Sequence, residues 1–315
     1  MKKKTAGKMK KKERIAAAVR GEPTDRIPFA LWLSSSGERP GAEESAERAY
    51  AFYQACDADI VKTLNSGMYS AEDFRTGDGA GKGPSVNTGA LAREQSGLKL
   101  LLDQTKGEVP VVFTVFSPFS AAEKLCPHIL QDIEAGQDRD IRQTLTVITE
   151  TTCELVRRVI ELGADGIFLE APLASYDRCS ERVYREYGMS YDLAVLSASG
   201  GWCNVLHGGG ADVMFPLLRK YPVQIFSWDA AVSLPEIGEA QALTGKCIMT
   251  GLDARHIEGR KRNEIERDIY ETLRRTGGRK LILSPGRGLS GMPDEETISF
   301  ARKSLEEIER ACLLR

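Results

Sequence analysis

Short apolar segments alternate with longer amphipathic segments along most of the sequence. The apolar segments have the length and β-branched content of buried strands, and nearly all are followed by apolar residues at helical spacing. The predicted strands cover residues 27–33, 59–62, 109–116, 166–170, 202–207, 223–228, 246–250 and 281–284. Eight strands alternating with helices predict an α/β fold, a (β/α)8 TIM barrel over residues 13–315, with an open doubly wound sheet as the alternative.

Charge and cysteine content limit the class of protein. With 43 basic and 45 acidic side chains and a net charge of −2, the chain lacks the basic excess of a nucleic-acid-binding protein. No segment approaches the ~20 apolar residues of a membrane span. The seven cysteines contain no C-x-x-C pair, which predicts no disulfide framework and favours a reducing cytoplasm. Residues 1–12 are rich in lysine and are predicted to be a disordered basic tail.

The stretch 202–210 (WCNVLHGGG) predicts a buried strand that ends at a functional loop. Side chains alternate along a strand, so His207 shares a face with Val205 and Cys203. The three glycines after His207 let the backbone approach a ligand closely. Alternatively, the glycines only permit a tight turn and His207 only ends the strand.

Polar and aromatic residues near the carboxyl ends of the other strands are further candidates, because barrel sites form at that end. A serine or aspartate there can also simply cap a helix or close a turn, and Glu170 can pair with a structural cation. The predicted catalytic residues are Glu170, His207 and Asp229. The predicted substrate-binding residues are Trp32, Ser34, Lys62, Asn65, Phe116, Trp228, Ser284 and Arg287.

The sequence also bears on a metal site and on a mobile loop. His207, Glu170 and Asp229 are possible zinc ligands, but Cys203 lies four residues away, ~13 Å along a strand, and Gly209 offers no ligand. We therefore expect no cofactor, with zinc or a corrinoid as the less favoured alternatives. Residues 65–88 are rich in glycine and longer than an ordinary connection, which predicts a lid over the site.

Motifs at both ends of the chain resemble the uroporphyrinogen decarboxylase superfamily. They are ERI at 13–15, RG at 20–21, DRIP at 25–28, and LSPGRG at 283–288 followed by PDE at 293–295. The resemblance covers most of the chain from residue 13 and implies a barrel fold. It also implies one of several activities, which include tetrapyrrole decarboxylation and methyl transfer with cobalamin or zinc.

The chain departs from both activity patterns within that superfamily. The decarboxylases have an arginine-rich R-x-x-G-R-Y segment after the first strand and an aspartate after the second. Here only Arg39 follows the first strand, and Asp59 precedes the second. The zinc methyltransferases have His-x-Cys after the fifth strand and a cysteine in S-P-G-C-G, where this chain has Gly209 and Arg287.

Three functions remain open from the sequence. We expect decarboxylation of a carboxylated small molecule, with a tetrapyrrole as one candidate. Arg287 would bind the carboxylate and lower the pKa of the neighbouring His207, and His207 would transfer a proton. The first alternative is a methyltransferase that works with a corrinoid protein, in which Glu170 and His207 act on the leaving group. The second is a non-catalytic tetrapyrrole- or corrinoid-binding protein. A homodimer is compatible with each.

Overall fold

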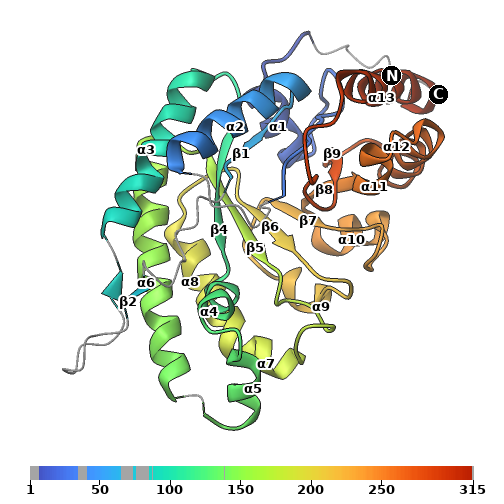
Figure 1. The fold of residues 1–315 in the computed structure, drawn as a ribbon. Helices are drawn as coiled ribbons and strands as arrows, with labels where there is room; N and C mark the ends of the chain where they lie inside the picture. The colour runs from blue at the N-terminus through green and yellow to red at the C-terminus, as the bar shows by residue number, and fades with distance from the viewer. Residues whose placement is uncertain are drawn as a thin grey trace.

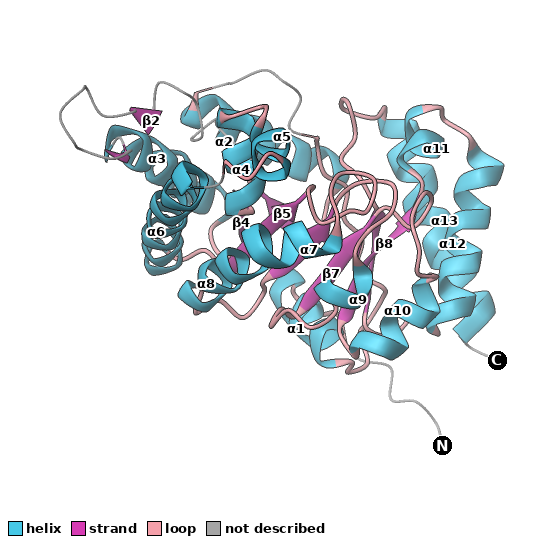
Figure 2. Cartoon of the chain, turned by 90° about the horizontal axis from the view of Figure 1, so that it is seen from below, coloured by secondary structure: helices cyan, strands magenta, loops and turns pink. Residues whose placement is uncertain are grey.

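A computed structural model describes residues 7–34, 41–64, 74–75, 85–86, 88–137 and 139–313. Its centre is a curled sheet of seven parallel strands in the order β1-β4-β5-β6-β7-β8-β9. These strands are β1 (Val61–Lys62), β4 (Val111–Phe116), β5 (Gly166–Ala171), β6 (Val205–Gly208), β7 (Ile225–Trp228), β8 (Cys247–Leu252) and β9 (Leu281–Pro285). All seven lie within or overlap strands predicted from the sequence. Figures 1 and 2 show the sheet in the centre with helices around it.

Most helices lie between consecutive strands and surround the sheet (Figure 2). The helices are α1 (Lys11–Arg20), α2 (Ala42–Cys56), α3 (Thr88–Thr105), α4 (Pro118–Leu125), α5 (Ile129–Glu134), α6 (Arg139–Leu162), α7 (Glu181–Tyr184), the π-helical turn η1 (Arg185–Met189), α8 (Ser190–Ala198), α9 (Phe215–Leu218), α10 (Ile237–Thr244), α11 (Ala254–Glu258), α12 (Arg262–Thr276) and α13 (Glu295–Leu313). Helices α1 and α2 precede β1, and α13 follows β9. Within the described residues, no helix is long and apolar enough to cross a membrane.

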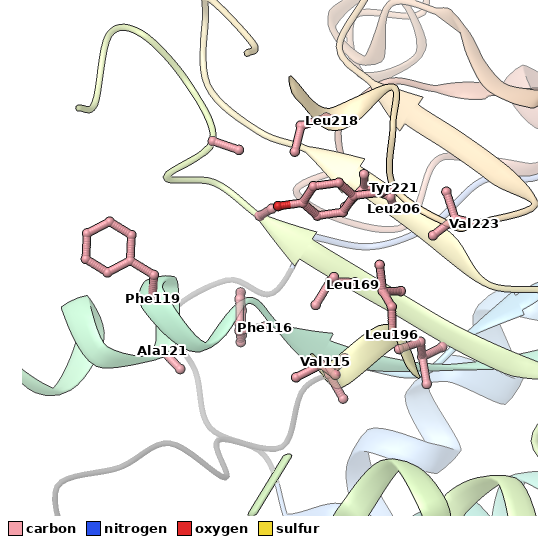
Figure 3. Packing of buried hydrophobic residues seen from close by; sticks show 14 of the residues in the cluster. Val115, Phe116, Phe119, Ala121, Leu169, Leu196, Leu206, Leu218, Tyr221 and Val223 are labelled. Atoms are coloured by element: carbon pink, nitrogen blue, oxygen red, sulfur yellow. The ribbon is translucent and has the colours of Figure 1, made fainter. Parts of the chain in front are cut away.

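Alternation along the strands separates two apolar layers. Val115, Leu169 and Leu206 point outward and pack with Leu196 of α8, as Figure 3 shows. Residues of the opposite parity, such as Phe168 and Val205, form a separate inner cluster with Trp32. The inner cluster fills the base of the curled sheet. The polar residues that follow on the same face therefore lie above an apolar floor.

The first predicted strand, 27–33, is not a regular strand in the structure. It forms isolated parallel bridges, Phe29 with Leu283 and Leu33 with Leu289. Pro28 has no N–H to donate to a ladder, although its carbonyl accepts from Leu283 N at 2.8 Å. On its other side the segment accepts from Asp59 N through the Phe29 carbonyl, also at 2.8 Å. The segment thus contacts both β9 and the residues that lead into β1.

Two further predictions concern the N-terminal tail and the lid. The predicted tail is wrong for Lys11 and Lys12, which begin α1 and form ion pairs with Asp57 and Asp165. Most of the predicted lid, residues 65–88, lies outside the described residues. Its described parts are a two-residue antiparallel pair, β2 (Phe74–Arg75) with β3 (Ser85–Val86), and the first residue of α3.

Candidate functional site

A row of three polar side chains crosses the sheet near its carboxyl edge. Glu170 of β5 lies directly opposite His207 of β6, and His207 lies directly opposite Ser227 of β7. Each is the next-to-last residue of its strand. In a parallel sheet these positions lie at one edge, where α/β enzymes place their sites. The predicted catalytic residues Glu170 and His207 are therefore neighbours.

His207 is held by its two aromatic neighbours and by Ser227. Its ring stacks on Phe168, with centroids 5.7 Å apart, and meets Trp32 edge-on at 5.3 Å. Its Nδ1 lies 3.1 Å from Ser227 Oγ, which leaves Nε2 as the nitrogen that Ser227 does not engage. Burial lowers the pKa of His207 to about 4, with Glu170 opposing and Lys62 adding to the shift. His207 is therefore a neutral imidazole near pH 7.

The lowered pKa predicts a specific titration for His207. We expect its imidazole to stay neutral from about pH 8 down to about pH 5 and to gain a proton only near pH 4, because burial disfavours the charged ring. NMR titration of the ring carbons, assigned by comparison with His207→Gln, measures this. A midpoint near the ordinary value of 6.5 would show that the ring is hydrated and not enclosed as the structure has it.

A buried ion pair lies beside His207. Lys62 Nζ is 2.8 Å from Glu170 Oε1, and the two side chains are only 3% and 14% exposed. Burial acts to raise the pKa of Glu170, but the neighbouring Lys62 ammonium, with a smaller contribution from Lys124, holds it below its ordinary value, so Glu170 is ionised. The separation is that of a strong ion pair, and Nζ has no further hydrogen-bond acceptor among the described residues. We take the contact as an ion pair that leaves N–H groups of Lys62 unused.

Aromatic rings enclose the ammonium of Lys62. Its Nζ lies 4.9 Å from the ring centroid of Trp32 and 4.9 Å from that of Phe168. The Trp32 indole N–H donates to the Pro285 carbonyl at 3.2 Å, which fixes the ring. We call Trp32, Lys62, Phe168, Glu170 and His207 the Lys62 cluster. It combines a cation, an anion and a neutral imidazole between apolar walls.

Arg287 and Asp229 belong to a different part of the same edge. The Arg287 guanidinium is paired with Glu258, with Nη2 2.7 Å from Oε2, and its side chain is 40% exposed. Burial raises the pKa of Asp229, with Asp253 adding to the effect and Arg287 opposing it. The positive neighbour that lowers the His207 pKa is Lys62. The prediction that Arg287 lowers the pKa of His207 is wrong, because the Arg287 guanidinium is ion-paired with Glu258.

The remaining predicted substrate-binding residues are not part of the Lys62 cluster. Trp228 faces the outer layer, is fully buried, and donates its indole N–H to the Ser233 carbonyl at 3.1 Å, so it is wrong as a site residue. Alternation explains this, because its neighbour Ser227 faces inward. Phe116 lies opposite Glu170 with the Lys124 ammonium over its ring. Ser284 is buried on β9, Ser34 is exposed after the bridged segment, and Asn65 lies outside the described residues.

The sequence interpretation missed Phe168 and Ser227. Both could have been found by alternation, because Phe168 is two residues before Glu170 and Ser227 is two residues after the inward-facing Ile225. Ser227 was not among the predicted residues, and a serine near a strand end can also simply cap a helix. Its role becomes visible only through the register that places Ser227 beside His207.

The zinc site implied by the resemblance does not fit this chain. A Cβ at Gly209 would lie 2.9 Å from Pro172 Cα, so the backbone leaves no room there for a cysteine. Arg287, in the place of the other cysteine, carries a positive charge and is paired with Glu258. No group of three or more histidine, cysteine or acidic residues suited to a metal occurs in the described part of the chain. We therefore derive no chemistry from zinc.

Two curated relatives are similar to most of this chain. The methylcobamide:CoM methyltransferase MtbA of Methanosarcina acetivorans is 24% identical over 226 residues, which is 59% of this chain and 66% of the relative. MtbA of Methanosarcina mazei is 24% identical over 232 residues, with the same coverage. The match thus spans slightly under two thirds of these relatives.

Solved structures share the fold. A methyltransferase from Methanosarcina mazei superimposes with a TM-score of 0.77 at 20% identity and covers 95% of this chain and 99% of that one. A B12-independent methionine synthase from a Shewanella species superimposes with a TM-score of 0.63 at 14% identity, over 92% and 97%. At these identities the likeness establishes the fold alone.

These relatives contradict the prediction of a decarboxylase. Both curated relatives are methyltransferases, and the residue that favoured decarboxylation, Arg287, is engaged by Glu258. The superfamily prediction is confirmed, since the sequence model of uroporphyrinogen decarboxylase (URO-D) matches residues 85–308. The chain therefore belongs to the uroporphyrinogen decarboxylase (URO-D) family.

Proposed function

We propose that this protein is an enzyme that transfers a methyl group between a corrinoid and a small molecule, with the corrinoid supplied by a partner protein. The observation that carries the proposal is the similarity to two methylcobamide:CoM methyltransferases over 59% of the chain. The Lys62 cluster is the proposed reaction site. It lies at the carboxyl edge of the parallel sheet, where the ends of β5 and β6 meet.

The geometry of the Lys62 cluster supports methyl transfer in two ways. The rings of Trp32 and Phe168 form an apolar wall suited to a methyl group and exclude water from the ions beside it. The neutral His207 can hydrogen-bond the heteroatom that carries or accepts the methyl group through Nε2. Neither role requires the guanidinium of Arg287, which is paired with Glu258.

The fold that positions this site is, we infer, a closed (β/α)8 barrel. The bridged segment 27–33 would serve as its eighth strand, because it contacts Leu283 of β9 on one side and Asp59, just before β1, on the other. Closure agrees with the position of Trp32 in the inner cluster and with its contacts to His207 and Phe168. The site would then lie in the barrel mouth.

An anaerobic assay with methylcobalamin and 2-mercaptoethanol tests the proposal. We expect the protein to accelerate the loss of methylcobalamin, followed by absorbance, and to keep its rate after dialysis against a chelator, because no zinc ligand set is present among the described residues. His207→Ala should lower kcat/KM by roughly 10²-fold, the usual range for a lost proton-handling group.

The matched control is His256→Ala. His256 lies outside the Lys62 cluster and contacts Asp268 through Nδ1 at 2.8 Å. It should leave the rate unchanged. An absence of acceleration at any thiol concentration would reject the proposal, and a rate that appears only after zinc is added would reject its metal-free form.

A further inference from the structure

The ammonium of Lys62 is a buried cation without a hydrogen-bond partner in the described part of the chain. The Lys62 side chain is only 3% exposed, and its Nζ has no hydrogen-bond acceptor among the described residues. Lysine is almost never this buried without full pairing, because a desolvated charge is costly. An ammonium carries three N–H donors, and the single ion pair with Glu170 leaves at least two of them without an acceptor among the described residues. The site therefore lacks an acceptor for Lys62.

The direction of Lys62 places these donors inside the curled sheet. Val61 belongs to the outward apolar layer, whereas Ile60 packs in the inner cluster with Trp32. By alternation Lys62 shares the inner face with Ile60. Its long side chain brings Nζ up to Glu170 and between the two rings, at the level of the polar row.

We propose that the Lys62 ammonium, in place of a metal ion, binds the sulfur or oxygen atom that gains or loses the methyl group. This inference rests on the proposed function and names the substrate class: a small thiol or hydroxyl compound, or its methyl derivative. Glu170 holds the Lys62 ammonium in place, and the unused N–H groups meet the substrate heteroatom.

The reaction balances in either direction. With a thiol, the S–H proton is released to solvent, the thiolate sulfur bonds to the methyl carbon, and the cobalt–carbon bond breaks with its electron pair remaining on cobalt. With a methyl ether the reverse occurs: reduced cobalt(I) bonds to the methyl carbon, the carbon–oxygen bond breaks, and the alkoxide or phenolate takes a proton from solvent. Negative charge resides on the heteroatom in both cases, and a fixed cation stabilises it.

Proton release without any corrinoid tests this role directly. Chelator-treated protein is titrated with 2-mercaptoethanol, and in a second arm with phenol, in a weakly buffered indicator solution near pH 7. We expect binding of one of the two probes to release up to roughly one proton per site, because a neighbouring cation favours the thiolate or phenolate. The arm that releases protons identifies sulfur or oxygen as the methyl-bearing atom.

The decisive variant is the pair Lys62→Met with Glu170→Gln, which removes both charges and keeps the side-chain volumes. It should fold, as circular dichroism will show, release no protons with either probe, and lose methyl transfer by about 10²–10³-fold. Lys124→Met is the matched control: Lys124 is an exposed lysine near the same carboxylate, outside the Lys62 cluster, and its loss should leave proton release intact.

Failure of the inference is separable from failure of the proposed function. Methyl transfer that persists in the folded double variant would overturn the role of Lys62 and leave the function standing. Lys62-dependent proton release without methyl transfer would reject the function and support the binding role. Equal proton release by the wild type and the double variant, or none by the wild type with either probe, would overturn the inference.

Discussion

Replacing Glu170 with glutamine is expected to lower the free energy of unfolding by about 3 kcal/mol at pH 7. The change leaves the Lys62 ammonium buried without its counter-ion, and an uncompensated buried charge costs far more than a lost surface pair. The effect should depend on pH. The folded-state pKa of Glu170 is lowered, so its contribution is present above the ordinary value of 4.5 and disappears as the pH falls through the folded-state pKa. Urea unfolding of both proteins between pH 7 and pH 3 measures this.

The double variant of Lys62→Met and Glu170→Gln provides the control for that experiment. A neutral pair of similar volume leaves no unpaired charge, and the methionine sulfur can pack against Trp32 and Phe168. It should therefore recover most of the stability that Glu170→Gln loses. If Glu170→Gln alone were as stable as the wild type at pH 7, the buried ion pair would not exist in solution.

Strand positions were predictable because buried parallel strands are continuous apolar runs bounded by turns. The segment 109–116 contains the observed β4, and 166–170 differs from β5 by one residue. The segment 27–33 was harder, since Pro28 interrupts the ladder while the surrounding residues still have strand character. Hydrophobic pattern alone does not distinguish a strand from a bridged extended segment.

The candidate site was predictable in position but only partly in composition. Strand ends identified Glu170, His207 and Lys62, and alternation could have excluded Trp228. The partner of each charge could not be read from the sequence, because Lys62 and Glu170 are far apart in the chain and meet only through the strand order. For the same reason Arg287 was assigned to a substrate carboxylate, while α11 supplies Glu258.

The N-terminal motif that carries the family resemblance has a structural role here. Asp59 is fully buried and accepts from Arg14 Nη1 at 2.7 Å, from Arg26 Nη1 at 2.6 Å and from the Phe29 N–H at 2.8 Å. Arg14 also donates to Asp25, with Nε 2.7 Å from Oδ1. The network ties α1 and the bridged segment to the residues before β1. Asp59, which precedes β1, therefore has a structural role and is not a residue of the site.

Replacing Asp59 with alanine is expected to destabilise the protein by about 3–5 kcal/mol, because it leaves Arg26 without this buried partner and the Phe29 N–H without an acceptor. The segment 27–33 should loosen first, since Asp59 holds it through both Arg26 and Phe29. Urea unfolding measures the loss, and hydrogen exchange of the Ala30 amide, which donates to the Leu283 carbonyl at 3.0 Å, locates it. Glu22→Ala is the matched control, because its exposed pair with Arg20 should contribute little. Unchanged stability together with full protection of Ala30 would show that Asp59 does not hold this segment, and Trp32 would then need another anchor to reach the Lys62 cluster.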